Sequence, residues 1–147
     1  MTRFPSNLVL VSKKSDKIVL DLSGNQISNL TYAVARYNNG DEGARLYQNI
    51  SQLFLTRNQI SVFQHGCLPR DLEELYLDQN HISQFSVYDI NYFDSLVNRT
   101  KLRLRLGNNP YSCSCDSTPL FHFIKNRGAK LEDQHTVMMK CDSQEVK

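Results

Sequence analysis

The chain has 147 residues, the length of about one domain, and its formal net charge is +2. Acidic and basic residues are mixed along it, which does not favour a nucleic acid or an anionic membrane as the main partner. No apolar run approaches the roughly 20 residues of a membrane-spanning helix. The first apolar stretch, residues 8–11, is shorter than the core of a secretion signal, about 7–15 residues.

Residues 1–17 form the first expected element, an N-terminal edge segment. Leu10 lies too close to Leu22 for a complete copy of the repeat that begins at residue 18. We therefore expect a hairpin-like strand that covers the first repeat. Because this segment holds no cysteine, we also expect that native sequence continues upstream, so that the chain is a fragment or a gene model that lacks its start.

A repeat dominates residues 18–109. Four segments share the template L-x-L-x-x-N-x-I, with Tyr111 replacing the last Ile in the fourth: VLDLSGNQI (19–27), ISQLFLTRNQI (50–60), LEELYLDQNHI (72–82) and LRLRLGNNP (102–110). This pattern, at spacings of about 20–29 residues, is typical of leucine-rich-repeat solenoids. The first spacing is longer, which indicates an insertion at YNNGDEG (37–43).

The template predicts a short strand in each repeat. Alternate side chains of a strand face opposite ways, so both leucines of each pair point into one core. The asparagine follows the strand, where its amide can bond backbone groups that no strand pairs. Stacked repeats therefore predict a ladder of asparagines, which are Asn25, Asn58, Asn80 and Asn109.

The predicted fold is α/β: a leucine-rich-repeat solenoid with a short parallel sheet, shaped as a horseshoe. An ordinary parallel α/β sheet would need crossover helices with sustained 3.6-residue periodicity. Residues 63–71, FQHGCLPRD, hold Gly and Pro instead. The connections at 29–46 and 83–97 have room for short helical turns on the convex side.

Residues 110–147 form a C-terminal cap in this interpretation. Thr118 suits a helix N-cap, Pro119 the first helical position and Gly128 the residue past the end. The helix between them has an apolar face of Leu120, Phe121, Phe123 and Ile124. We expect it to lie over the open end of the solenoid and shield the last leucines.

The chain has four cysteines: Cys67, Cys113, Cys115 and Cys141. A zinc site needs four well-spaced Cys or His ligands, and the spacing of His122 and His135 suits no such signature. A redox motif C-x-x-C is absent. Structural disulfides in an oxidising compartment are the favoured interpretation. Cys67 is either a buried small apolar residue or a thiol that is reactive or pairs with another chain.

Three N-x-[ST] sequons begin at Asn29, Asn49 and Asn98. All three asparagines fall outside the L-x-L strand cores, so a glycan there need not clash with the sheet. We expect them to be glycosylation sites.

The strand positions beside the leucines face outward and form the candidate binding surface. These positions flank the leucines of each pair: Asp21 and Ser23 in the first repeat; Gln52, Phe54 and Thr56 in the second; Glu74, Tyr76 and Asp78 in the third; and Arg103, Arg105 and Gly107 in the fourth. Aromatic side chains bordered by both signs of charge suit a protein partner. The alternative is an ordinary solvated sheet face.

No catalytic motif is found. The sequence has no G-x-S-x-G, no H-E-x-x-H and no Gly-rich phosphate loop, and its acidic clusters suit solvated surfaces. We expect a non-enzymatic protein without a metal or another cofactor.

The segment NPYSCSCDSTPLFHFIKN and the later MMKC resemble the cysteine-rich C-terminal flank of leucine-rich-repeat ectodomains, and more narrowly the membrane-proximal flank of insect Toll-type receptors. The phrase LPRDLEELYLDQNHI is similar to the adjoining Toll repeats. The resemblance covers residues 18–141. It implies a Cys113–Cys141 disulfide, with a partner for Cys115 beyond residue 147.

The resemblance also implies a function. The chain would be part of a receptor ectodomain outside the plasma membrane, anchored only through a missing downstream helix, or secreted. Its partner would be an extracellular protein, such as a cystine-knot cytokine, or another receptor chain, in innate immune or developmental signalling. The alternative is a leucine-rich-repeat adhesion, guidance or matrix protein.

Overall fold

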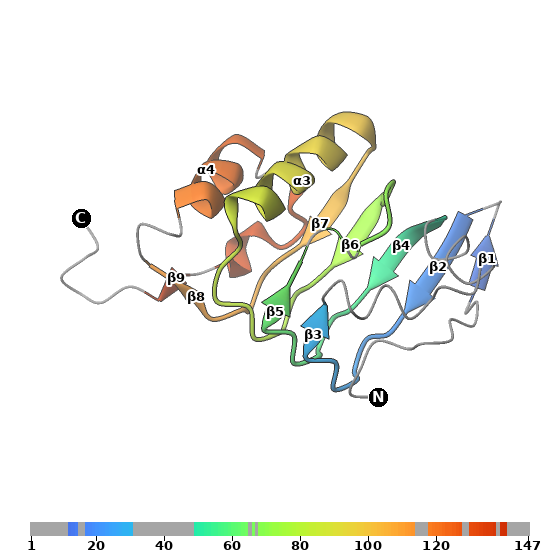
Figure 1. Cartoon of the computed structure of the whole chain (residues 1–147), viewed down its shortest axis with the longest axis horizontal. Coiled ribbons are helices and arrows are strands. Elements are labelled where there is room, and N and C mark those ends of the chain that lie inside the picture. The colour runs from blue at the N-terminus through green and yellow to red at the C-terminus, as the bar shows by residue number, and fades with distance from the viewer. Residues whose placement is uncertain are drawn as a thin grey trace.

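The computed structural model describes residues 12–14, 17–30, 49–64, 66, 68–113, 118–127, 130–137 and 139–140. Its main feature is a five-stranded sheet with the strand order β1-β2-β4-β6-β7 (Figure 1). Four of these strands run parallel, as the solenoid prediction requires. They are β2 (Lys17–Asp21), β4 (Ile50–Phe54), β6 (Glu74–Tyr76) and β7 (Arg103–Arg105).

The leucines of the repeat form one column across these strands. Leu20 pairs with Leu53, Leu53 with Leu75 and Leu75 with Leu104. Each of the four is at most 4% exposed, and full burial of a leucine contributes about 1.5–3 kcal/mol. The second leucines of the pairs are buried as well: Leu22, Leu55, Leu77 and Leu106. Each repeat thus hides the apolar face of its neighbour, which confirms the predicted stacking.

Two shorter ladders follow the main sheet. Strand β3 (Asn29–Leu30) pairs in parallel with β5 (Val62–Phe63), and β8 (Tyr111–Ser112) pairs in parallel with β9 (Met139–Lys140). The β3–β5 pair lies beside the ends of β2 and β4 in Figure 1. The chain therefore turns a corner after β2 and after β4 and then pairs briefly with the neighbouring coil, whereas the short strand after β7 pairs with a strand of the cap.

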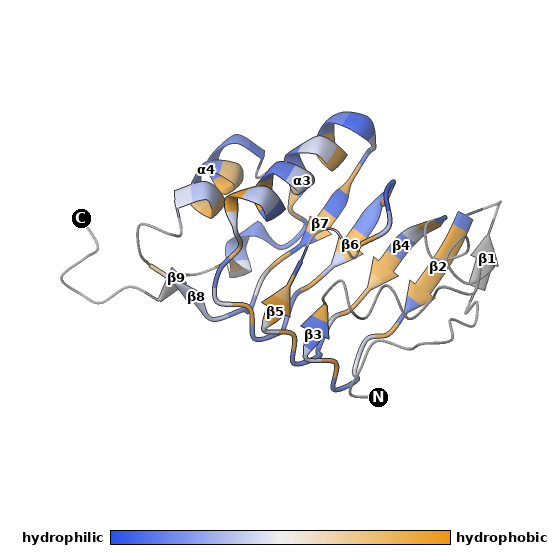
Figure 2. Ribbon diagram, in the orientation of Figure 1, coloured by the Kyte–Doolittle hydropathy of each residue, from blue (hydrophilic) through white to orange (hydrophobic). Residues whose placement is uncertain are grey.

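Helix α3 (Val87–Arg99) occupies the convex side, where the sequence predicts short helical turns. Its start is set by a capping box, in which Ser86 accepts from the Asp89 N–H and Asp89 accepts from the Ser86 N–H. One face of the helix is buried, and Phe93 contacts Phe85 edge-on with ring centroids 5.3 Å apart. Figure 2 shows hydrophobic residues along β2 and β4 and a mixture of both kinds on α3.

Strand β1 (Ser12–Lys14) lies at the N-terminal edge of the sheet and pairs antiparallel with β2. A strand over the first repeat is expected from the sequence. Its N–H and C=O groups satisfy an edge that would otherwise be open to other chains. Leu8, Leu10 and the predicted insertion at 37–43 lie outside the described residues.

The C-terminal cap differs from the prediction in the position of its helix. Helix α4 (Thr118–Arg127) packs beside α3 rather than over the last leucines, and its Phe123 ring lies 6.0 Å from that of Phe93. Residues 130–137, which include a 3-10 turn at Gln134–Thr136, cover the edge of β7 instead. Leu131 forms a parallel bridge with Leu104, and the Glu132 N–H donates to the Leu104 carbonyl at 2.9 Å. An edge strand needs extended backbone as its partner, which a helix cannot supply.

The start of α4 also differs from the prediction. Thr118 is the first residue of the helix and not its N-cap, a shift of one position at a boundary that periodicity alone defines poorly. Gly128 lies outside the described residues. Among the helices of the described part, none has the length and apolar character that crossing a bilayer requires.

Candidate functional site

The positions that flank the buried leucines form the concave face, which comprises Asp21, Ser23, Gln52, Phe54, Thr56, Glu74, Tyr76, Asp78, Arg103 and Arg105. Gly107, which the sequence also predicts to face outward, is buried beneath Asp133 and Thr136 instead. The parallel register aligns these side chains in rows that cross the strands. Gln52 is opposite Glu74, and Glu74 is opposite Arg103; Phe54 is opposite Tyr76, and Tyr76 is opposite Arg105. The sheet therefore brings together residues that are 22 to 29 positions apart in sequence.

The first row centres on Glu74, which is only 7% exposed. Its Oε1 accepts a hydrogen bond from Gln52 Nε2 at 3.2 Å and a charged one from the Arg103 guanidinium. The hydrogen bond to Glu74, together with the charge of that carboxylate, raises the pKa of Arg103. A buried carboxylate needs such partners, because burying an unpaired one costs roughly several kcal/mol of folding free energy.

The second row is aromatic. The rings of Phe54 and Tyr76 lie 4.7 Å apart and are tilted by 30°, and the Arg105 guanidinium sits 5.0 Å from the centre of the Tyr76 ring. Such a cation–π contact contributes about 0.5–1 kcal/mol at an exposed site. Asp21 continues the row beyond Phe54 and is exposed. This row presents flat apolar surface with charge at both ends.

The third row is polar and tightly bonded. Thr56 Oγ1 donates to Asp78 Oδ1 at 2.7 Å, and Arg105 Nη1 lies 3.9 Å from Asp78 Oδ2. Asp78 is only 3% exposed. Its role in this arrangement is to hold Thr56 and Arg105 in place.

Glu132 is a member of this surface that sequence reasoning missed. Its Oε2 accepts from the Tyr76 hydroxyl at 3.0 Å and lies 3.4 Å from Arg105 Nε, and its Oε1 lies 3.4 Å from Arg103 Nε. Burial raises the pKa of Tyr76 well above its ordinary value, and the hydrogen bond to Glu132 raises it further. Glu132 belongs to no repeat, so only the pairing of its segment with β7 could reveal it.

Asp133 is the second residue that sequence reasoning missed, and its role is structural. Its Oδ1 accepts from the Leu106 N–H at 3.1 Å, and its Oδ2 accepts from the Gly107 N–H at 2.8 Å. These two donors follow β7, where no further repeat supplies acceptors. The Asp133 carboxylate therefore closes the last coil.

The repeat asparagines make hydrogen bonds to adjacent coils. Asn58 Nδ2 donates to the carbonyls of Leu22 and Leu55, both at 3.0 Å, and its Oδ1 accepts from the Ile27 N–H. Asn80 and Asn109 repeat this arrangement one coil further on, while Asn25 donates within its own coil. At the corner that follows each strand, these amides bond backbone groups that no neighbouring strand pairs.

The three sequon asparagines are not among the residues of the concave face. Asn29 begins β3, Asn49 directly precedes β4 and Asn98 is in the last turn of α3. All three are exposed.

The cysteines are described only in part. Cys113 directly follows β8 and is disulfide-bonded. Cys67, Cys115 and Cys141 lie outside the described residues. Within the part of the chain that the structure places, no three His, Cys, Asp or Glu side chains are grouped to hold a metal ion.

The concave face has the composition of a protein-binding surface. The side chains of Arg103 and Arg105 are 60% and 41% exposed, beside two half-buried aromatic rings. Arginine and tyrosine are enriched among the residues that dominate binding energy in protein interfaces. Most of the charges already pair with one another, which fixes the shape of the surface before a partner arrives.

No protein-family model matches the sequence, but a curated protein and several solved structures are similar to the chain. The chain is similar to Protein toll of Drosophila melanogaster, with 27% identity over 94 residues, which are 63% of this chain and 8% of that protein. The chain thus corresponds to a small part of that relative.

Solved structures show the same architecture. One is the structure of the Toll–Spatzle complex, described as a molecular hub in Drosophila development and innate immunity; a chain in it matches 94% of this chain over 17% of its own length, with a TM-score of 0.69 and 19% identity. Its glycosylated form gives a TM-score of 0.69 and 18% identity, over 92% of this chain and 16% of that one. Human 5T4 (Wnt-activated inhibitory factor 1, trophoblast glycoprotein) gives 0.65 and 18%, over 86% and 41%. The chain therefore has a leucine-rich-repeat fold and resembles a segment of a Toll-type receptor ectodomain.

Proposed function

We propose that this chain is a segment of a Toll-type receptor ectodomain that binds an extracellular protein through its concave face. The observation that carries the proposal is the Phe54–Tyr76–Arg105 row, which is half-exposed and held between two rows of paired polar side chains. The similarity to Toll in sequence and in fold supports a receptor over an adhesion, guidance or matrix protein. The function is binding and not catalysis.

The proposed partner is an extracellular protein of the cystine-knot cytokine class, or a second receptor chain. Toll forms a complex with Spatzle, which supports a protein ligand here. The charges on the concave face favour a protein partner as well. Charges of both signs at an interface fix the orientation of the partner and the specificity of binding more than they raise its affinity. We place the segment on the outer side of the plasma membrane, in innate immune or developmental signalling.

The proposed cap, residues 110–147, is closed by a Cys113–Cys141 disulfide. The parallel register Tyr111↔Met139 and Ser112↔Lys140 supports this pairing, because Cys113 and Cys141 each come one position after a paired residue in the sequence. The sequons at Asn29, Asn49 and Asn98 agree with the same extracellular location, and all three asparagines are exposed. Mass spectrometry of the non-reduced protein tests the pairing; a Cys67–Cys141 bridge would overturn it.

The binding proposal is tested with the double substitution Phe54→Ala and Tyr76→Ala. Surface plasmon resonance would measure binding of the folded chain to a purified cystine-knot cytokine and to a tagged second copy of the chain. We expect the double variant to bind at least about tenfold more weakly, since aromatic residues at the centre of an interface each contribute roughly 2 kcal/mol or more.

The matched control is Tyr88→Ala, which removes an aromatic ring that is 69% exposed on the convex helix α3. This variant should bind as well as the unchanged chain. Equal binding by the double variant, with its fold intact by circular dichroism, would refute the concave face as the binding surface.

A further inference from the structure

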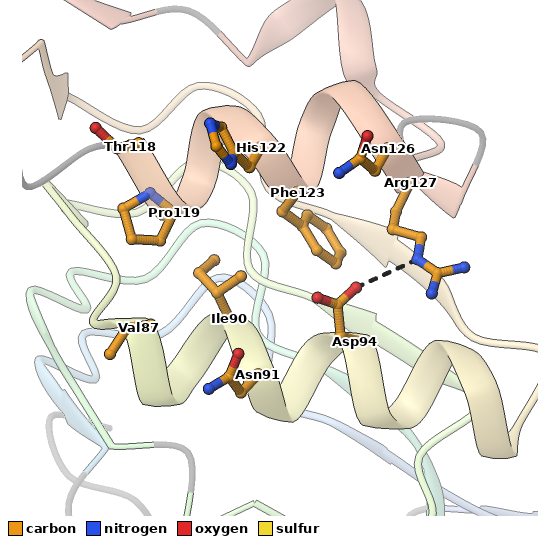
Figure 3. Close-up of a pocket in the computed structure, with 10 residues that line it drawn as sticks. All are labelled: Val87, Ile90, Asn91, Asp94, Thr118, Pro119, His122, Phe123, Asn126 and Arg127. Atoms are coloured by element: carbon orange, nitrogen blue, oxygen red, sulfur yellow. Dashed lines mark hydrogen bonds and ion pairs between the residues drawn. The ribbon is translucent and has the colours of Figure 1, made fainter.

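Asp21 differs from the other exposed acidic residues of the described chain because no Lys or Arg pairs with it. Its Oδ1 accepts a hydrogen bond from the Ser23 N–H at 2.9 Å, and its Oδ2 contacts no donor among the described residues. On the convex side, by contrast, Arg127 of α4 bridges to Asp94 of α3, with Nε 3.3 Å from Oδ1 (Figure 3). The remaining exposed or half-exposed carboxylates in the described ranges are paired as well, namely Asp71 with Arg99, Glu73 with Lys17, and Glu132 with Arg103 and Arg105.

The unpaired carboxylate lies beside an aromatic ring. Asp21 on β2 is opposite Phe54 on β4, and neighbouring strands lie about 5 Å apart. Both residues alternate with buried leucines, so both side chains face the concave side. Strand β1 pairs with β2 only over Lys17–Val19, so its described residues stop short of Asp21. The Asp21 carboxylate and the half-buried Phe54 ring are therefore neighbours on an exposed part of the face.

The other end of the same row shows how this chain completes such a pair. The Arg105 guanidinium lies 5.0 Å from the centre of the Tyr76 ring, and the Glu132 carboxylate contacts the same guanidinium. Ring, cation and carboxylate thus occur together at Tyr76. Phe54 has the ring and Asp21 has the carboxylate, but among the described residues no cation lies over Phe54. Because the face of an aromatic ring attracts a cation, the missing member of this group is a positive charge.

The charge balance of the concave face favours the same conclusion. Its described side chains, with Glu132 included, carry four carboxylates and two guanidiniums, so the net charge of the face is −2, whereas the whole chain carries +2. The ion pair of Lys17 with Glu73 adds no net charge. A surface whose sign is opposite to that of the chain steers a partner of complementary charge toward itself. The complementary partner of this face is basic.

We propose that Asp21 and Phe54 form a subsite that receives a lysine or arginine side chain of the protein partner. The cation lies over the Phe54 ring and donates a hydrogen bond to the Asp21 carboxylate. Contact with the partner removes water from both groups, which strengthens the two attractions. The inference rests on the concave binding face proposed above and adds the charge that the partner presents to it.

The test selects binders of the folded full chain from a displayed library of random peptides. Only peptides that fail to bind the variant Phe54→Ala with Tyr76→Ala are counted, because these use the aromatic row. We expect Lys and Arg to be enriched at least about threefold in them over the starting library, a ratio that one exposed ion pair can supply. Since the chain itself carries +2, nonspecific attraction would enrich acidic peptides instead.

Two variants of Asp21 locate the source of the enrichment. Asp21→Asn keeps an Oδ1 that can accept from the Ser23 N–H and removes the charge, so the enrichment in Lys and Arg should disappear. Asp21→Lys should reverse it in favour of Asp and Glu. The matched control is Asp71→Asn, which removes the same charge at an exposed position outside the concave face, and the enrichment should persist there.

The possible failures can be told apart. If the counted peptides show no excess of Lys and Arg, or if the excess survives Asp21→Asn, the inference is wrong while binding at the concave face still stands. If no selected peptide depends on Phe54 and Tyr76, the concave face itself is contradicted and the inference falls with it. Circular dichroism of each variant establishes that the fold is intact.

Discussion

The Tyr76 hydroxyl donates a hydrogen bond to Glu132 Oε2 at 3.0 Å, across 56 positions of sequence. This bond joins the centre of the concave face to the segment that covers β7. Arg103 and Arg105 contact the same carboxylate. Glu132 therefore sets the position of three side chains on the proposed binding surface, and the C-terminal cap is part of that surface as well as its end.

The stability of the chain should depend on pH through Tyr76. Burial and Glu132 raise the pKa of Tyr76 in the folded state above its value of about 10 in the unfolded state. The stabilisation is therefore complete below pH 10 and is lost as the pH rises further, because only the unfolded chain ionises. Urea unfolding at pH 8 and pH 11 should show that the unchanged chain loses about 1 kcal/mol more than Tyr76→Phe. Equal losses in both proteins would contradict this account.

Asn80→Ala should be among the more damaging single substitutions. Asn80 is 3% exposed, donates to the carbonyls of Leu55 and Leu77 and accepts from the Ile60 N–H. Its removal leaves buried backbone groups without partners, at a cost of about 3 kcal/mol in free energy of unfolding. Chemical denaturation measures this loss.

The control for Asn80 is Asn91→Ala, at an exposed position of α3, which should change stability by less than about 0.5 kcal/mol. Asn80→Asp is informative too, because a carboxylate keeps the acceptor for Ile60 and loses both donors. If Asn80→Asp were as stable as the unchanged chain, the donated bonds would not matter.

Gly107→Ala should weaken the contact between the cap and the last strand of the solenoid. A Cβ at this position would lie 1.8 Å from Thr136 Oγ1 and 2.7 Å from Asp133 Oδ2, so the 133–136 turn would have to move. We expect a loss of about 2–3 kcal/mol in unfolding free energy and faster hydrogen exchange at the Leu106 and Gly107 amides, which Asp133 now binds.

Gly24→Ala is the comparison for Gly107→Ala. Gly24 has a positive φ of 71° and open space around its Cβ position, so its cost is conformational, about 1 kcal/mol. Adding Thr136→Gly to Gly107→Ala should recover part of the loss and should not help Gly24→Ala. Failure of this rescue would mean that the contact with Thr136 is not the cause.

Ser86→Ala should weaken helix α3 specifically. The Ser86 hydroxyl accepts from the Asp89 N–H at 3.1 Å as half of the capping box. Loss of such a cap costs about 1 kcal/mol. Amide exchange in the first turn of α3 should rise, while exchange in β4 and β6 should stay unchanged. Uniform destabilisation would show that α3 unfolds only together with the sheet.

The sequence by itself determined the solenoid. Every coil needs apolar residues at the same positions to cover its neighbour, so leucines recur at regular intervals in the sequence. This recurrence is enough to assign Leu53, Leu75 and Leu104 to one buried column. The positions of the outward side chains follow from the same alternation. That the concave face binds a partner stays a prediction.

Only the tertiary structure decided how the solenoid ends. The last coil has no following repeat, so its backbone takes partners from a segment outside the pattern, through Leu131, Glu132 and Asp133. The same fact places α4 against α3 and not over the leucines. A repeating sequence pattern reports the contacts that similar coils make with one another. A contact that occurs once, between two different segments, produces no such pattern and cannot be predicted from it.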